Sequence, residues 1–204
     1  MTALIIVDMQ KDFMSGGALP VPGADGIIPT INQLIEKFSL VLATKDWHPP
    51  DHMSFAVSHP RKKVGDVVTI QGVSQILWPV HCVRDTEGSE FVSGLHTDKV
   101  TSVFLKGTDK WIDSYSTFFD NARKKSTGLT DYLLSRDIKR VYLAGVAFEY
   151  CVLYSALDTA DLGFETFVVL DACRGINLHP KDEEMALAAM SAKGVHLITS
   201  EEIR

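Results

Sequence analysis

Cys151, Asp8 and Lys106 are reactive side chains that stand at or just beyond the expected ends of apolar runs. We expect Cys151 in the first turn of a helix, where the positive end of the helix dipole favours the thiolate, the nucleophilic form of cysteine. A neighbouring Lys106 would favour the thiolate further, and Asp8 could take the thiol proton as a general base. If Lys106 is buried it needs a carboxylate partner, and Asp8 is the candidate. These residues indicate nucleophilic catalysis, although Cys151 could instead be a small buried hydrophobe.

A second group of side chains could bind a metal ion. Asp46 and His48 are two residues apart, so an extended segment would project both to the same side. With His81 they provide two imidazoles and a carboxylate, a set that suits zinc or iron(II) and leaves coordination positions open. His52 could be a further ligand or a hydrogen-bond donor beside the ligands, and we favour the donor. The alternative is that these histidines are scattered over loops and surface.

The elements that must position these residues alternate between two patterns. Short apolar runs rich in β-branched residues predict buried strands, and segments with one apolar helical face lie between several of them. This alternation predicts an α/β fold, a single domain over residues 1–204 with a mostly parallel sheet and helices on both faces. The expected strands are 3–8, 40–44, 100–105, 139–144, 165–170 and 195–199, and the expected helices are 27–38, 129–134, 152–162 and 183–192.

The carboxyl ends of these strands are where a ligand site is expected, because ligands of open parallel sheets bind there. Asp8, Asp46, Lys106 and the segment before Cys151 all lie at such ends. Residues from about 49 to 98 interrupt the alternation, since they are rich in proline and glycine and offer one weak strand candidate at 67–70. A loop-rich insertion of this length is usually functional, and we expect it to carry part of the metal site.

Composition limits the class of protein. The chain has 204 residues, 46% of them hydrophobic, a net charge of -6 and 3 cysteines. The acidic balance makes nucleic acid or an anionic membrane an unlikely partner, and no apolar stretch approaches the length of a membrane span. Few cysteines and no signal-peptide pattern lead us to expect a cytoplasmic protein. Cys82 and Cys173 lack the placement at a strand end that distinguishes Cys151, and they are expected to be buried bystanders.

Read in order, the motifs resemble those of the nicotinamidases of the isochorismatase-like cysteine hydrolase superfamily, a fold of the Rossmann-like α/β/α type. The resemblance covers most of the chain, from Ile5 to about Asp171. The motifs that carry it are Ile6-Val7-Asp8-Met9-Gln10-x-Asp12-Phe13, Thr44-x-Asp46-Trp47-His48-Pro49, Leu77-Trp78-Pro79-Val80-His81-Cys82-Val83, Lys106-Gly107 and Gly145-Val146-Ala147-(x)3-Cys151.

The resemblance implies an activity: hydrolysis of nicotinamide to nicotinate and ammonia through a cysteine thioester, feeding NAD salvage, with pyrazinamide as a surrogate substrate. It implies Cys151 as nucleophile, Asp8 as general base and acid, and Lys106 as the cation that holds them. It also implies one divalent metal ion held by Asp46, His48 and His81. We expect zinc, with iron or manganese as alternatives, and leave open whether the chain forms a homo-oligomer.

The resemblance also implies the walls of a substrate pocket. Phe13 and Trp78 match residues that sandwich the pyridine ring, and Tyr115 matches an aromatic residue of the pocket wall. The backbone N–H groups of Ala147 and Cys151 would receive the oxyanion of the tetrahedral intermediate. A cis peptide bond is expected between Val146 and Ala147.

Other functions remain open at this point. The nearest is another small-amide cysteine hydrolase of the same superfamily, acting for instance on carbamoyl or ureido groups. An iron oxygenase with a facial triad of two histidines and a carboxylate would leave Cys151 and Lys106 without a role. A non-catalytic binding module would bind substrate without turnover. The chain departs from the family pattern at Phe148-Glu149, where many members have a Thr-Asp pair.

Overall fold

A six-stranded parallel sheet forms the centre of the molecule in the computed structural model, which describes residues 1–203. The strand order is β5-β2-β1-β6-β7-β8, so the first strand of the chain lies near the middle of the sheet. The prediction of a mostly parallel sheet is confirmed. The strands are β1 (Thr2–Val7), β2 (Val41–Asp46), β5 (Ser102–Lys106), β6 (Arg140–Val146), β7 (Glu165–Arg174) and β8 (His196–Ile198).

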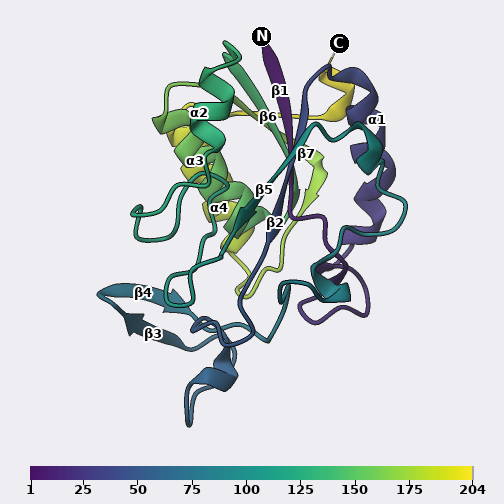
Figure 1. The fold of residues 1–204 in the computed structure, drawn as a ribbon. Coiled ribbons are helices and arrows are strands. Elements are labelled where there is room, and N and C mark those ends of the chain that lie inside the picture. Colours follow the sequence, from purple (N-terminus) through teal and green to yellow (C-terminus); the bar gives the residue numbers. More distant parts are fainter. Residues whose placement is uncertain (204) are drawn as a thin grey trace.

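Helices cover both faces of this sheet, as expected (Figure 1). On one face, Leu4 and Ile6 of β1 belong to the same apolar cluster as Ile31 of α1 (Ile28–Lys37). The alternate β1 side chains, such as Ile5, face the cluster formed with the other helices. Successive residues of a strand point to opposite faces, so the buried β1 contributes to both apolar layers. The helices of the second face are α2 (Leu129–Leu134), α3 (Leu153–Asp161) and α4 (Asp182–Ala192).

Most of the long segment between β2 and β5 lies beyond the carboxyl edge of the sheet, below it in Figure 1, and its last part runs back beside α1. It contains an antiparallel hairpin of β3 (Val67–Ile70) and β4 (Val73–Ile76) and several single 3-10 turns. The second hairpin strand was not predicted. Its turn uses Gln71 and Gly72 at φ 50° and 81°, and glutamine at the first position is not the usual Asn or Asp signal.

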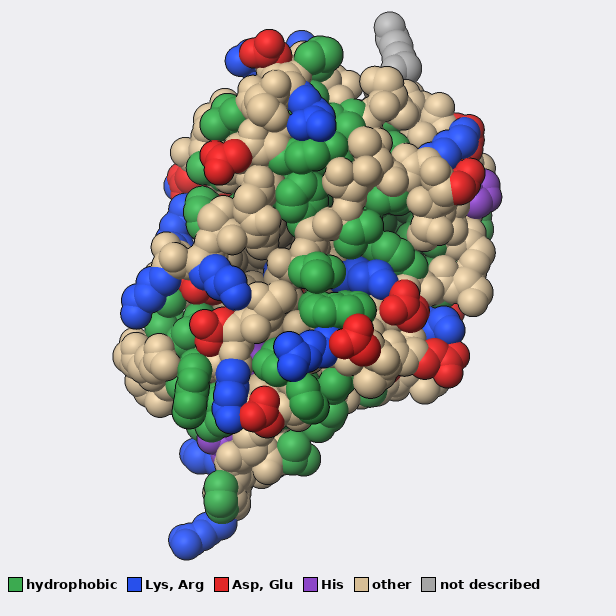
Figure 2. Space-filling view, in the orientation of Figure 1, with side chains coloured by type: hydrophobic (Ala, Val, Ile, Leu, Met, Phe, Trp, Pro, Cys, Tyr) green, Lys and Arg blue, Asp and Glu red, His purple; other side chains and the backbone are tan. Residues whose placement is uncertain are grey.

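The surface carries charges of both signs. Figure 2 shows acidic and basic side chains interspersed over the face that it presents. Within residues 1–203, no helix combines the length and apolar character needed to cross a membrane. Cys82, Cys151 and Cys173 are all buried with free thiols, as expected for the two outside the catalytic group.

Candidate active site

The carboxyl ends of four neighbouring strands bring the predicted residues together. Asp8 follows β1, Asp46 and Lys106 are the last residues of β2 and β5, and Ala147 follows β6. Asp46 and Lys106 are direct partners in the pairing of β2 with β5. Because these strands are adjacent in the order β5-β2-β1-β6, a short path along one edge of the sheet joins all four positions.

Lys106 lies at the centre of this group and is almost fully buried, with 1% of its surface exposed. Its Nζ lies 2.8 Å from Asp8 Oδ2 and 2.5 Å from Asp46 Oδ1, and it donates to the Ser114 carbonyl at 3.0 Å and to Cys151 Sγ at 3.3 Å. Burial opposes the charge, but the Asp46 and Asp8 carboxylates raise the pKa of Lys106 well above its ordinary value. The side chain is therefore an ammonium that joins two carboxylates and the thiol.

Cys151 lies in a π-helical turn, Phe148–Val152, which continues into α3. Burial raises the pKa of its thiol well above the ordinary value, Lys106 lowers it, and the Asp8 and Asp46 charges raise it again. The expectation that Lys106 and the helix dipole favour a resting thiolate is therefore incomplete, because burial and two carboxylates outweigh them. The thiol keeps its proton until a base accepts it.

Asp8 is placed to be that base. Its side chain is fully buried, Thr44 Oγ1 donates to its Oδ1 at 2.6 Å, and one of its oxygens lies within 4.8 Å of Cys151 Sγ. Burial raises the pKa of Asp8, although Lys106 acts in the opposite direction. A carboxylate with a raised pKa is a stronger base, so it can accept the thiol proton more readily than an exposed aspartate.

Asp46, His48 and His81 form a cluster of donor atoms that fits a divalent metal ion. One ligand atom from each lies within 4.8 Å of the others, and the Nε2 atoms of His48 and His81 lie 3.7 and 3.8 Å from Asp46 Oδ2. The Nδ1 atoms face the carbonyl oxygens of Gly107 at 2.9 Å and Pro79 at 2.8 Å. Carbonyls only accept, so in the neutral ring, the form that binds a metal ion, each Nδ1 bears the proton and each Nε2 keeps a free lone pair.

The metal-binding interpretation is supported by an unpaired atom. His48 Nε2 is buried and has no hydrogen-bond partner within residues 1–203, which is costly unless a ligand occupies its lone pair. A Cβ on Gly107 would lie 2.3 Å from the His48 ring, so this close carbonyl contact needs glycine. Burial opposes ionisation of Asp46, but the Lys106 ammonium holds the pKa of that carboxyl well below its usual range. Asp46 is thus ionised, and the donor set is oriented for a cation.

His52 has the opposite ring orientation. The backbone N–H of Ser54 donates to His52 Nδ1 at 3.0 Å, so in the neutral ring the proton is on Nε2. Burial, with the nearby His48, lowers the pKa of His52 to about 4, which keeps the ring neutral at physiological pH. The Nε2–H is buried and unpaired in the described residues, and this ring has no free lone pair for an ion there. In this tautomer His52 offers the donor cluster no lone pair.

Asp113 is a functional candidate that the sequence analysis missed. It is 3% exposed and lies with His48 and His52 in a second set of donor atoms within 4.8 Å of one another. It also lines a cavity together with Cys151 and His81. It stands in an irregular segment between β5 and α2, so no strand end or helix start pointed to it. The only sequence signal was its position two residues before Tyr115, a predicted pocket residue.

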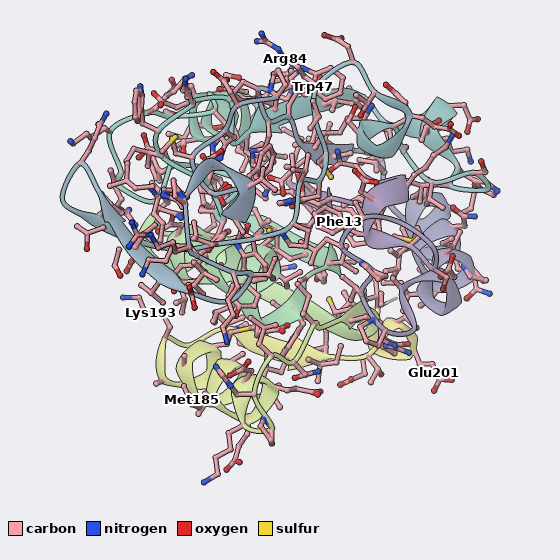
Figure 3. All side chains as sticks on the ribbon, turned by 90° about the horizontal axis from the view of Figure 1, so that it is seen from below. Phe13, Trp47, Arg84, Met185, Lys193 and Glu201 are labelled. Carbon is pink, nitrogen blue, oxygen red and sulfur yellow. The ribbon has the colours of Figure 1, made fainter. Side chains whose placement is uncertain are left out.

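A small cavity connects the thiol to the metal-type cluster. Seen from the carboxyl edge of the sheet, Phe13 lies near the middle of the molecule, whereas Trp47 and Arg84 lie at its rim (Figure 3). Trp78 Nε1 donates to Tyr115 Oη at 3.1 Å, which fixes two of the predicted pocket residues against each other. The cavity is lined by Phe13, Leu19, Asp46, Trp78, His81, Asp113, Tyr115, Ala147, Tyr150, Cys151 and Ile176.

The turn after β6 offers a free backbone donor to this cavity. The Val146–Ala147 peptide bond is cis, as the resemblance implied. The Ala147 carbonyl accepts the N–H groups of Tyr150 and Val152, both at 3.1 Å. The Ala147 N–H finds no acceptor within residues 1–203, and Cys151 stands four residues further on in the same turn. A backbone donor beside a nucleophile can stabilise an oxyanion.

Comparisons with known proteins agree with this geometry. The isochorismatase domain profile matches residues 2–202. The nicotinamidase of Escherichia coli (strain K12) is 40% identical over 201 residues, which cover 97% of this chain and 94% of that protein. A solved structure described as an Acinetobacter baumanii nicotinamidase and pyrazinamidase has a TM-score of 0.97 at 43% identity, covering 100% of this chain and 98% of that one.

A further solved structure bears on the metal. It is described as the pyrazinamidase of Pyrococcus horikoshii in complex with zinc, and it has a TM-score of 0.79 at 42% identity. The alignment covers 97% of this chain and 98% of that one. The likeness therefore spans the whole fold, including the edge of the sheet where the donor cluster lies.

Proposed function

This chain belongs to the isochorismatase domain family, and from that membership and its site we propose that it is a nicotinamidase. It hydrolyses nicotinamide to nicotinate and ammonia, and accepts pyrazinamide as a surrogate. The observation that carries the proposal is the contact of the buried Lys106 with both Cys151 and Asp8. Cys151 lines a cavity that Asp46 and His81 of the donor cluster also line.

The proposed reaction uses the chain's own groups in sequence. Asp8 takes the proton from Cys151 Sγ, and the thiolate attacks the carboxamide carbon. The N–H groups of Ala147 and Cys151 hold the resulting oxyanion. Asp8 gives the proton to the amine, the C–N bond breaks, and ammonia leaves a thioester on Cys151. Water, deprotonated by Asp8, then cleaves the thioester, and nicotinate departs as the thiol regains its proton.

Phe13 and Trp78 are proposed to hold the pyridine ring between them, with Tyr115 on the pocket wall. Phe13 and Trp78 are 3% exposed, and all three side chains line the cavity beside Cys151. Aromatic contacts with a flat ring contribute about 1 kcal/mol each, which is enough to orient the carboxamide toward the thiol.

We propose zinc as the ion that Asp46, His48 and His81 hold, with the irregular segment around residues 49–98 supplying His81. Iron or manganese remains an alternative, because this donor set accepts both. When bound, the ion would supply a Lewis acid for the pyridine nitrogen and open positions for water. The zinc-bound pyrazinamidase relative supports this choice.

A cytoplasmic location, a role in NAD salvage and a homo-oligomeric state stay predictions.

The deciding experiment incubates the purified protein with nicotinamide and measures ammonia and nicotinate. We expect one ammonia per nicotinate, and a mass increase on Cys151 equal to a nicotinoyl group in samples quenched with acid during turnover. Ureido and carbamoyl substrates tested in parallel address the other hydrolases of the superfamily. Oxygen uptake without ammonia release would instead favour the facial-triad oxygenase, which gives the contact of Lys106 with Cys151 no role.

A further inference from the structure

The turn that carries Cys151 also contains a buried carboxylate that the proposed reaction does not use. Glu149 lies two residues before Cys151 in the π-helical turn, and 6% of its surface is exposed. Buried carboxylates are rare unless they are paired or hydrogen-bonded, and no lysine or arginine of the described residues forms an ion pair with this one. The hydrogen-bond partners of Glu149 therefore indicate why a carboxylate is buried at this position.

Those partners are backbone groups of the loop that follows β7. Glu149 Oε1 accepts the N–H of Asn177 at 2.5 Å, and Oε2 accepts the N–H of Ile176 at 3.2 Å. Within the described residues neither N–H has another backbone acceptor. Hydrogen bonds to an ionised acceptor are about twice as strong as neutral ones. One side chain thus fastens this loop to the turn of the nucleophile.

Gly175 shows how closely the Glu149 carboxylate approaches the backbone of this loop. A Cβ at this position would lie 2.4 Å from Glu149 Oε2, nearer than any side chain could be placed. The glycine is needed here for space, since its φ lies outside the left-handed region. Glu149 and Gly175 therefore form a matched pair, in which the long side chain of one fills the space that the other leaves.

The fastened loop forms part of the substrate cavity. Ile176 lines the same cavity as Cys151 and Tyr150, and its side chain packs against the apolar cluster on the α1 face of the sheet. Ile176 thus forms one wall of the cavity. The distance between Ile176 and the Cys151 thiol depends on how the loop is held, and Glu149 supplies the hydrogen bonds that hold it.

We propose that Glu149 is a positioning residue that sets the width of the substrate cavity by fixing Ile176 relative to Cys151. The proposal rests on the proposed nicotinamidase function. According to the proposal for Glu149, the cavity wall fixed at Ile176 admits flat, unsubstituted six-membered aromatic carboxamides and discriminates against rings that bear an added methyl group. Glu149 does not touch the reacting atoms, so its effect is on binding and selectivity rather than on the chemical step.

The test compares the wild-type chain with Glu149→Gln and Glu149→Asp. Glutamine offers one acceptor oxygen in place of two, and aspartate keeps the charge but is one methylene shorter. We expect each variant to raise the KM for nicotinamide about tenfold, as the loss of one charged hydrogen bond predicts, with kcat changed less than about threefold. The ratio of kcat/KM for nicotinamide over 5-methylnicotinamide should fall by a similar factor. Glu184→Gln, an exposed change in α4, is the matched control.

A second measurement does not depend on activity. Hydrogen exchange at the Ile176 and Asn177 amides should be slow in the wild-type chain and at least tenfold faster in Glu149→Gln, while the amides of β6 keep their protection. Unchanged KM and selectivity, or unchanged exchange at both amides, would overturn the proposal. If the wild-type chain releases no ammonia from nicotinamide, the proposed function fails, and slow exchange retained in Glu149→Gln would separately refute the role of Glu149.

Discussion

The Lys106 ammonium donates to the thiol of Cys151 across 3.3 Å, although both residues are almost completely shielded from solvent. This contact favours the thiolate. Burial raises the thiol pKa, and the Asp8 and Asp46 charges raise it further. The thiol is therefore held protonated beside both a cation and a carboxylate. In the proposed reaction this arrangement limits unwanted reactions of the thiol and still permits attack when substrate is bound.

Removing the Lys106 charge should make Cys151 harder to ionise. We expect Lys106→Met to move the pH profile of Cys151 alkylation by iodoacetamide to higher pH by about one unit or more, because a contact cation no longer stabilises the thiolate. Mass spectrometry of the peptide containing Cys151 gives the rate at each pH. Lys106→Arg, which keeps the charge, should move the profile less. An unchanged profile in Lys106→Met, with its circular dichroism intact, would remove Lys106 from this role.

Loss of the nucleophile should abolish turnover without unfolding the chain. We expect Cys151→Ala to lower kcat for nicotinamide by at least about a thousandfold, because no other thiol lines the cavity. Circular dichroism and the thermal midpoint should change little, since a buried Cys-to-Ala change removes only a small side chain. Cys173→Ala is the control, because Cys173 is equally buried but lies outside the cavity. Ammonia release retained in Cys151→Ala would contradict the proposed thioester.

Gly107 offers a way to disturb the metal site without removing a ligand. Its φ is +63°, and a Cβ would lie 2.3 Å from Cε1 and 2.6 Å from Nδ1 of His48. We expect Gly107→Ala to push the His48 ring from its place and to lower the zinc content of the purified protein, measured by inductively coupled plasma mass spectrometry, from about one ion per chain to well below half.

The control for this change is Gly94→Ala. Gly94 also has a positive φ, +88°, but no atom lies within 4 Å of its added Cβ. The two variants therefore share a backbone strain of about 1 kcal/mol, and only Gly107→Ala adds the collision with His48. Equal zinc content in both variants would argue that His48 is not held by the close contact with Gly107.

Much of this site could be predicted because strand ends are visible in the sequence. The apolar run before Asp8 is uninterrupted, and Val103-Phe104-Leu105 precede Lys106, so the strands, their parallel arrangement and the shared edge followed from the pattern. The strand β4 could not be predicted from the sequence, because Val73-Ser74-Gln75-Ile76 lacks the alternation of a half-buried strand. Asp113 was missed because irregular segments carry no periodicity that would place a residue in space.

The state of the histidine rings also required the structure. Sequence spacing made His52 a candidate ligand or donor, and only its hydrogen bonds distinguish the two. The backbone N–H of Ser54 points at His52 Nδ1, whereas His48 and His81 direct the same atom at a carbonyl. The ring nitrogen that faces the metal-type cluster is thus a donor in one residue and an acceptor in the other two.

This difference predicts distinct tautomers that nuclear magnetic resonance can read. In protein labelled with ¹⁵N at histidine and freed of metal, long-range proton-nitrogen spectra should show His52 with its proton on Nε2, and His48 and His81 with theirs on Nδ1 when neutral. Addition of zinc should shift the Nε2 signals of His48 and His81 strongly and that of His52 little. A proton on Nδ1 of His52, or a large zinc shift at its Nε2, would make it a ligand.

The pH dependence of the same spectra follows from burial of the His52 ring. Burial, with His48, lowers the pKa of His52 from 6.5 to about 4, so the unfolded chain binds this proton more readily than the folded one. The contribution of His52 to the free energy of unfolding is therefore present above about pH 6.5 and is lost as the pH falls toward 4. In metal-free protein the His52 signals should stay those of a neutral ring down to about pH 5, whereas protonation near pH 6.5 would show that the ring is not enclosed as the structure has it. His52→Gln should reduce the loss of stability over this pH range, and chemical denaturation at pH 5 and pH 7 measures the difference.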